Sequence, residues 1–195
     1  PYTTLFRSVA DAPFRYWDFA LTDRSRWYGE GFPLTVDWIY PILSAEDKAT
    51  IRTVFMRWCD ENRTAGTTNN NHPQPVGVTN DPALTADRAY VRWSGNNYFA
   101  AHMRNMGLMG LALDAADDPS GALATCLDQA TGAWLYVLDD QMRTDLAGGM
   151  SAEGYEYGPQ TFGYTAEFLW ALHTAGEDDP AVRGPQVTFD GNPFW

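Results

Sequence analysis

The chain has little of several features that would classify a protein quickly. Its 195 residues include two cysteines and three histidines, and no apolar run approaches the ~20 residues that a membrane span requires. There are 13 basic residues against 25 acidic ones, and no basic run offsets this balance, which argues against a binder of duplex nucleic acid. No spacing typical of metal ligands, no phosphate-binding loop and no nucleophile elbow stands out. We therefore expect no metal, no cofactor, no nucleic-acid partner and no membrane span.

The composition that is present favours a packed globular domain. The chain is 45% hydrophobic and 14% aromatic, which is enough to bury a substantial core. No stretch has the alternating pattern of a β-strand, so the expected class is all-α. Residues 1–8 resemble one reading frame of a short-read sequencing adapter, and we expect them to be an artefact. Residues 9–195 are then interpreted as a fragment of a single domain.

Apolar residues that recur every three or four positions predict the helices. Residues 13–22 are compatible with a helix whose ends the pattern does not define. The clearer helices are expected over 33–42, from Ser44 to about Arg63, over about 96–116, from about 120 to 145, and from Pro159 to Gly176. The polar stretch 64–95 is predicted to be a long connection.

Two helix ends carry specific signals. Ser44 is predicted to cap the second clear helix, with Asp47 reaching back to the free N–H groups. Gly176 is expected to close the last helix, because glycine adopts the positive φ of such an ending at little cost.

The order of short and long connections predicts which polar residues meet. Helices joined by a tight link lie antiparallel, so the links around 41–44 and 117–120 should lie at one end of the bundle. The stretches 9–32, 64–95 and 146–158 should then lie at the other end. Loops at one end of a rigid scaffold are where functional residues concentrate.

The same geometry predicts the state of the cysteines. Cys59 lies near the end of one helix and Cys126 near the start of another that should run parallel to it. If these helices start level, the two residues differ in height by roughly 13 Å, which is beyond disulfide reach. Both are therefore predicted to be separate core thiols.

The stretch from Gly148 to Gly158 reads GGMSAEGYEYG and has little that suits a core. We expect a loop that presents Glu153, Tyr155, Glu156 and Tyr157 beside the N-terminus of the last helix. Unpaired N–H groups at such a terminus favour bound anions.

Three segments in this order and spacing resemble a known family. They read DWIYPILSAED (37–47), SGNNYFAAH (94–102) and the glycine-rich stretch 148–158. Together they are similar to the heparinase II/III-like and alginate-lyase-like (α/α) toroids. The resemblance implies an incomplete toroid of antiparallel helical hairpins, with a carbohydrate cleft across one end. It also implies a secreted or periplasmic protein whose partner is a polysaccharide or oligosaccharide.

The resemblance implies roles for particular residues. In such lyases an asparagine neutralises the uronate carboxylate, and tyrosine or histidine removes the C5 proton and protonates the leaving oxygen. By position Asn97 resembles the asparagine, Glu153 the acid of the glycine-rich loop and Tyr164 the tyrosine of the following helix. Tyr157 could share the acid and base roles, and His102 could assist.

Two departures from the family pattern weigh against elimination chemistry. Tyr98 stands where some relatives have a histidine directly after the asparagine. Glu156 stands where some have an arginine, so a cation is missing from beside the proposed tyrosine.

The remaining candidates each have an ordinary structural interpretation as well. Asn96 and Asn97 could simply cap a helix. Tyr98 and His102 lie one turn apart, as a base and its orienting partner would, but a buried histidine in the core fits equally. Gln160, with Tyr164 and Glu167, forms a polar stripe, although Glu167 is expected to be solvated.

Further substrate-binding candidates lie near the start of the chain or in its glycine-rich stretch. Tyr155 could stack on sugar rings or could pack between helices. The same alternatives apply to the aromatic pair Trp27 and Tyr28, and the nearby arginines Arg24 and Arg26 could bind an acidic sugar. His72 and His173 are given little functional weight.

Three functions remain open at this point. The leading hypothesis is a polysaccharide lyase-like enzyme that cleaves a uronate polymer by β-elimination. The second is a glycoside hydrolase on the same scaffold, with Glu153 and Glu156 or an aspartate as the carboxylate pair. The third is a helical domain that binds glycans without turnover. The sequence leaves the oligomeric state open.

Overall fold

The computed structural model describes residue 26 and residues 29–64, 78–151 and 153–195. Every regular element in these ranges is a helix and none is a strand, which confirms the all-α prediction. The main helices are α3 (Gly31–Ile39), α4 (Ala45–Thr64), α5 (Pro82–Ala86), α6 (Arg88–Ser94), α7 (Asn97–Leu111), α8 (Ala122–Gln129), α9 (Tyr136–Arg143), α10 (Gly154–Ala175) and α11 (Pro180–Arg183). None of those described has the length and hydropathy that crossing a membrane requires.

Helix α4 begins where its capping residues predict. The hydroxyl of Ser44 donates to Asp47 Oδ2 over 2.7 Å and accepts from the Asp47 N–H over 3.2 Å. The apolar face of the helix is completely covered, since its members are at most 1% exposed: Ile51, Val54, Phe55 and Trp58. The predicted cap and the predicted face are therefore both confirmed.

Helix α7 runs through the centre of the bundle and packs against α3, α4, α8 and α10. Its glycines permit this close packing, because a Cβ at Gly107 would lie 2.3 Å from the ring of Phe168. The helix ends at Leu111, five residues before the predicted end. The Asp114 N–H donates to the Tyr40 hydroxyl over 3.0 Å instead of continuing the helical ladder.

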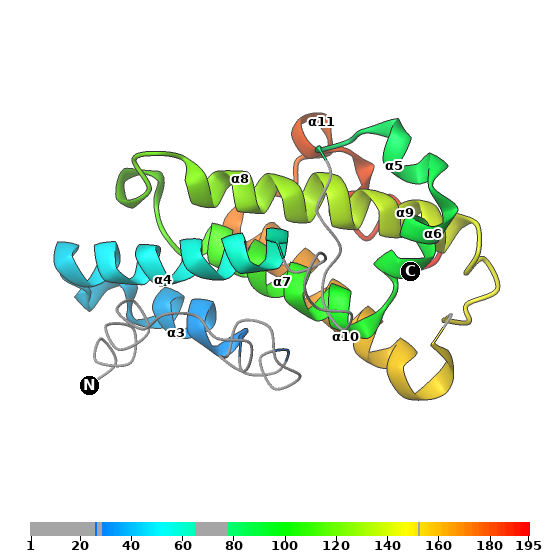
Figure 1. Ribbon diagram of the computed structural model, residues 1–195, viewed down its shortest axis with the longest axis horizontal. Helices are drawn as coiled ribbons and strands as arrows, with labels where there is room; N and C mark the ends of the chain where they lie inside the picture. Colours follow the sequence, from blue (N-terminus) through cyan, green and yellow to red (C-terminus); the bar gives the residue numbers. More distant parts are fainter. Residues whose placement is uncertain (1–25, 27–28, 65–77, 152) are drawn as a thin grey trace.

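Helices α8 and α9 form one continuous rod (Figure 1). Between them lies a π-helical segment, η5 (Ala130–Leu135), which the sequence pattern does not reveal. The first part of the rod packs against α4 and α7, and the last part packs against α6. The predicted helix over about 120–145 is therefore correct in extent.

The two short links lie together, as the connectivity predicts. Lys48, at the start of α4, forms an ion pair with Asp117 over 2.8 Å, and Tyr40 also donates to Asp117. One turn along α4, Arg52 pairs with Asp118 over 2.8 Å. The link between α7 and α8 thus lies alongside the first half of α4.

This placement overturns the predicted separation of the cysteines. Because the link covers the first turns of α4, helix α8 begins well along α4 and not level with its start. Cys126 therefore lies close to the last turns of α4, where Arg63, one turn beyond Cys59, donates to the Cys126 sulfur over 3.0 Å. Both are free thiols in the core, as expected, but they form one pair.

The predicted connection 64–95 was wrong in its second half, because residues 82–94 form α5 and α6. Each helix has an aspartate cap: Asp81 accepts from the Ala83 N–H over 2.9 Å, and Asp87 accepts from the Ala89 N–H over 3.0 Å. Asp81 is followed by a proline, which suits the first helical position. These signals could have been found in the sequence.

Helix α10 begins five residues earlier than predicted. Gly154–Gly158 is the first turn and a half of the helix, so this part is not the predicted loop. Pro159 lies inside the helix, close enough to its solvent-exposed start for the missing hydrogen bond to be tolerated. At the other end Gly176 has φ 72°, and Glu177 N–H donates to the Leu172 carbonyl over 2.9 Å, which confirms the predicted ending.

Candidate functional site

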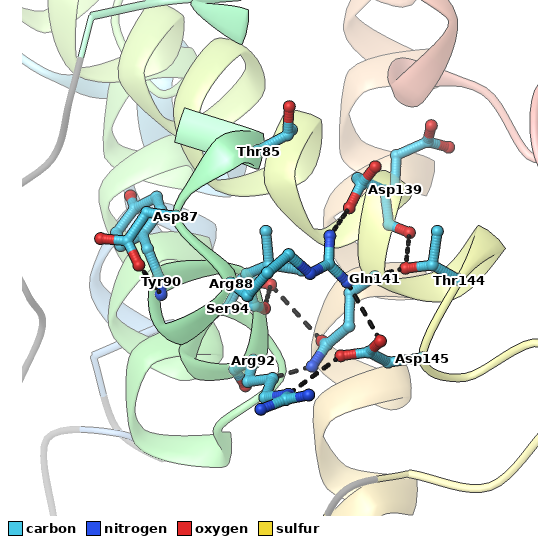
Figure 2. Close-up of polar contacts among 12 residues, drawn as sticks. Thr85, Asp87, Arg88, Tyr90, Arg92, Ser94, Asp139, Gln141, Thr144 and Asp145 are labelled. Carbon is cyan, nitrogen blue, oxygen red and sulfur yellow. Dashed lines mark hydrogen bonds and ion pairs between the residues drawn. The ribbon is translucent and has the colours of Figure 1, made fainter. Parts of the chain in front are cut away.

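The candidate site lies at the start of α7. Three side chains hold the connection between α6 and α7, which is called the joint below. Gln141, on α9, is fully buried and donates to the Arg92 carbonyl over 3.1 Å (Figure 2). Trp134 donates to the next free carbonyl, that of Ser94, over 3.2 Å. From α10, Thr161 donates to the carbonyl of residue 95 over 3.1 Å. The end of α6 is thereby capped, and the start of α7 has a fixed position.

A surface network ties α6 to the end of α9 (Figure 2). Arg88 donates to Asp140 over 2.6 Å and to Asp145 over 3.0 Å. Arg92 donates to the same Asp145 carboxylate over 3.2 Å. The network anchors the chain just before it enters the segment that leads to Glu153.

Glu153 joins the starts of two helices. Its Oε2 accepts from the Asn97 N–H over 2.6 Å and its Oε1 accepts from the Asn96 amide over 2.7 Å. Asn96 also caps α7, because its Oδ1 accepts from the N–H groups of residues 98 and 99. A carboxylate at this position is stabilised by the partial positive charge of the α7 N-terminus. Asn96 thus caps the helix and also binds the acid of the glycine-rich segment.

Burial raises the pKa of Glu153 above its usual value. The hydrogen bond from the Asn97 N–H, the charge of Arg26 and the hydrogen bond from Asn96 act in the opposite direction. Desolvation outweighs all three, since it penalises the charged form of a half-buried carboxyl group. A raised pKa is a property that a proton donor near neutral pH requires.

Two further predicted residues join this cluster. The Asn97 amide is 1% exposed and donates to Gln160 Oε1 over 3.4 Å. The Arg26 guanidinium lies 3.9 Å from the centre of the Tyr98 ring, and Arg26 is 5% exposed. The structure therefore brings together Asn97, Glu153 and four of the predicted substrate-binding residues, Arg26, Asn96, Tyr98 and Gln160.

A buried arginine that the sequence reasoning missed lies two turns further along α7. Arg104 is 1% exposed, pairs with Glu167 over 2.7 Å and also pairs with Glu30. Its guanidinium lies 4.4 Å from the centre of the Tyr164 ring. The expected solvation of Glu167 holds only in part, because its side chain is 33% exposed and its carboxylate is held by this arginine. A single arginine within an otherwise apolar helix was the available signal.

Arg104, from α7, is a cation that lies beside the Tyr164 ring, whereas position 156 on α10 is a glutamate. Its pairing with Glu30 and with Glu167 keeps it in place. Burial raises the pKa of Glu30, an effect that the charge of Arg104 opposes.

The other predicted residues differ in exposure. Tyr155 is 86% exposed and Tyr157 is 42% exposed, and both lie with Glu156 at the exposed start of α10. His102 is fully buried, which fits the alternative of a core histidine, and its part in proton transfer stays a prediction. Arg24, Trp27, Tyr28 and His72 lie outside the described residues.

One described groove lies away from Glu153. It has a volume of about 400 Å³ and runs between α3, α7 and α10 toward the C-terminal end of α10. Its lining is mainly apolar and includes Pro33, Leu34, Leu108, Leu111, Trp170 and Ala171. Glu167 borders it, so the groove begins beside the Arg104 ion pairs.

Within the described ranges no three histidine, cysteine or acidic side chains gather as metal ligands would. No protein-family model matches the chain, and comparisons with curated proteins and with solved structures find no match. The resemblance to the toroid lyases therefore rests on the three sequence segments alone.

Proposed function

We propose that the chain is part of a carbohydrate-active toroid domain that cleaves a uronate-containing polysaccharide by β-elimination. The observation that supports it best is the junction of Asn97, Glu153 and Gln160, with Tyr157 and Tyr164 on the adjoining part of α10. These residues come from two helices whose N-termini meet at one end of the bundle. The substrate would be a polysaccharide or oligosaccharide.

The chemistry requires a neutralised carboxylate beside a base. The C5 proton of a uronate is acidic only when the charge of the adjacent carboxylate is matched. Asn97 is 1% exposed, so in this proposal the partly exposed Gln160 side chain moves aside and the uronate carboxylate takes its place on the Asn97 amide, where the existing contact of 3.4 Å is long. Tyr164 or Tyr157 then removes the proton and returns one to the leaving oxygen.

Arg104 has a supporting role in this proposal. Its guanidinium lies against the ring of Tyr164 and carries a fixed positive charge. A cation packed against an aromatic ring attracts the ring and so holds it in position. Arg104 is a positioning residue, because it is buried and does not touch the polymer.

The test is incubation of the chain with heparin, alginate and related uronate polymers, followed by the ultraviolet absorbance of the unsaturated product. We expect product from the unaltered chain. Tyr164→Phe and Asn97→Ala should each lower its rate by about 10²-fold or more. Tyr136→Phe is the matched control, because this tyrosine lies on α9 and is not among the proposed site residues, so the rate should be unchanged. Absence of unsaturated product from every uronate polymer contradicts the proposal.

The raised pKa of Glu153 favours a second candidate, a glycoside hydrolase. A general acid of such an enzyme is a carboxyl group whose burial keeps it protonated. Glu156, which is exposed one turn along the chain, is the available second carboxylate. A new reducing end without an unsaturated product distinguishes this reaction from elimination.

A further inference from the structure

The two cysteines of the chain form a buried pair between α4 and α8. Cys59 and Cys126 are both fully buried, and each thiol influences the pKa of the other. They come from helices that lie side by side in parallel. Because Arg63, one turn beyond Cys59, reaches the Cys126 sulfur, the two thiols lie near enough for a limited displacement to bring them to disulfide geometry.

An arginine one turn beyond Cys59 is fixed beside the pair. Arg63 donates to the Cys126 sulfur over 3.0 Å. Its other nitrogens donate to Gln129 and to Asp60, each over 2.8 Å, so the guanidinium has a single defined place. A positive charge in direct contact with one sulfur stabilises the thiolate of that cysteine.

The two sulfurs consequently differ in acidity. The hydrogen bond from Cys59 and the charge of Arg63 lower the pKa of Cys126. Burial raises the pKa of Cys59 well above its usual value. One cysteine is thus suited to act as a thiolate nucleophile while its neighbour holds a proton for the next step.

We propose that Cys59 and Cys126 are a modification site, a redox-active dithiol that a small hydroperoxide converts to a disulfide between α4 and α8. The residues that carry it are the two cysteines and Arg63. It stands independently of the proposed carbohydrate chemistry, since none of the three belongs to the Glu153 cluster.

The reaction balances in two steps. The Cys126 thiolate attacks one oxygen of hydrogen peroxide, the O–O bond breaks, and the released hydroxide takes a proton to become water. Cys126 is now a sulfenic acid. The Cys59 sulfur then attacks the Cys126 sulfur, the S–O bond breaks, and the departing hydroxyl leaves as a second water with the Cys59 proton. Two thiols are oxidised and one peroxide is reduced.

A small oxidant suits this site because both sulfurs are covered. Local opening of the α4–α8 contact gives access without global unfolding. The closed bond joins two helices that are far apart in sequence, so it removes freedom from the unfolded chain. The oxidised chain should therefore melt at a higher temperature than the reduced one.

The test is treatment of the reduced, folded chain with hydrogen peroxide, followed by intact-mass measurement and peptide mapping. We expect a loss of two hydrogen atoms and one peptide pair linked through Cys59 and Cys126. Dithiothreitol should restore the original mass and the lower melting temperature. Arg63→Met should slow the reaction by about tenfold, because less of Cys126 is then thiolate.

Cys59→Ala is the matched variant, since it keeps Cys126 and its contact with Arg63 and removes the second thiol. Circular dichroism checks its fold, and its oxidation should stop at the sulfenic acid, which a dimedone probe detects. Two outcomes overturn the proposal. One is that both thiols of the folded, unaltered chain survive excess peroxide, and the other is that they oxidise separately without a link. Neither result requires any variant to fold.

Discussion

Glu153 and Asn97 are 56 residues apart in the chain, yet the carboxylate of one accepts the backbone N–H of the other over 2.6 Å. This bond, with the one from Asn96, fixes the start of α7 against the start of α10. The geometry at this end of the bundle therefore depends on one acidic side chain.

Replacing Glu153 should weaken the fold as well as any activity. Glu153→Ala removes the acceptor of two hydrogen bonds, and we expect a loss of about 1–3 kcal/mol in the free energy of unfolding. Glu153→Gln should cost less, because one acceptor oxygen remains. Urea denaturation measures both. Glu156→Ala is the control, and it should change stability by no more than about 0.5 kcal/mol, because this side chain is exposed. Equal effects at 153 and 156 would contradict the structural role of Glu153.

Tyr90 should titrate unusually late. Burial raises its pKa from the ordinary 10.0 to about 12, and its hydroxyl is buried without a hydrogen-bond partner. The pKa of Tyr90 is higher in the folded chain than in the unfolded chain. Its contribution to the free energy of unfolding is therefore complete below pH 10 and is lost as the pH rises through about 12. The Tyr90→Phe variant should lack the late phase of the phenolate absorbance titration. It should also be as stable as the unaltered chain or about 1 kcal/mol more stable, since an unpaired buried hydroxyl is removed.

Gly107 of α7 and Gly163 of α10 should respond oppositely to alanine. A Cβ at Gly107 would lie 2.3 Å from Phe168, so Gly107→Ala should cost about 1–3 kcal/mol. At Gly163 nothing lies within 4 Å of the same atom. Gly163→Ala should therefore stabilise the helix by about 0.5–1 kcal/mol. Thermal melting compares the two, and the same sign of change for both would contradict this packing.

Two arginines in ion pairs should differ in their effect on stability. Arg104 is 1% exposed, and Arg104→Met leaves Glu30 and Glu167 without their cation at a partly buried position. We expect a loss of about 2–4 kcal/mol, less than a fully buried pair costs, because both glutamates remain a third exposed. Arg88, in the surface network of Figure 2, is 41% exposed, so Arg88→Met should cost no more than about 1 kcal/mol.

A salt titration separates the two arginines further. Added salt should shrink the cost of Arg88→Met and leave that of Arg104→Met nearly unchanged, because exposed charges are screened more than buried ones. Equal salt dependence would contradict the difference in burial.

Much of the fold was predictable because its signals are local. The Ser44–Asp47 cap, the buried face of α4 and the ending at Gly176 follow from residues within one or two turns. The meeting of the short links follows from connectivity alone.

What the sequence did not predict depends on contacts between distant segments. The height of Cys126 relative to Cys59 is set by the link that packs along α4, and a pattern within one helix cannot reveal such an offset. Arg104 could be seen as a charge within an apolar helix, but its partners lie on other elements. The start of α10 was misplaced because glycine and proline normally mark loops, whereas here Gly158 lies directly against Ser151.

The π-helical segment at residues 130–135 rotates the side chains of α9 about the helix axis relative to those of α8. Extra residues in a wider turn rotate everything downstream about the axis without a bend. In its α8 part the rod can therefore turn Leu123 and Cys126 toward α4 and α7. In its α9 part it can turn Leu138 and Gln141 toward α6. Deleting one residue from this segment would rotate α9 relative to α8, so only one of the two helices could keep its contacts. The joint before α7, which positions Asn97, would then lose its support.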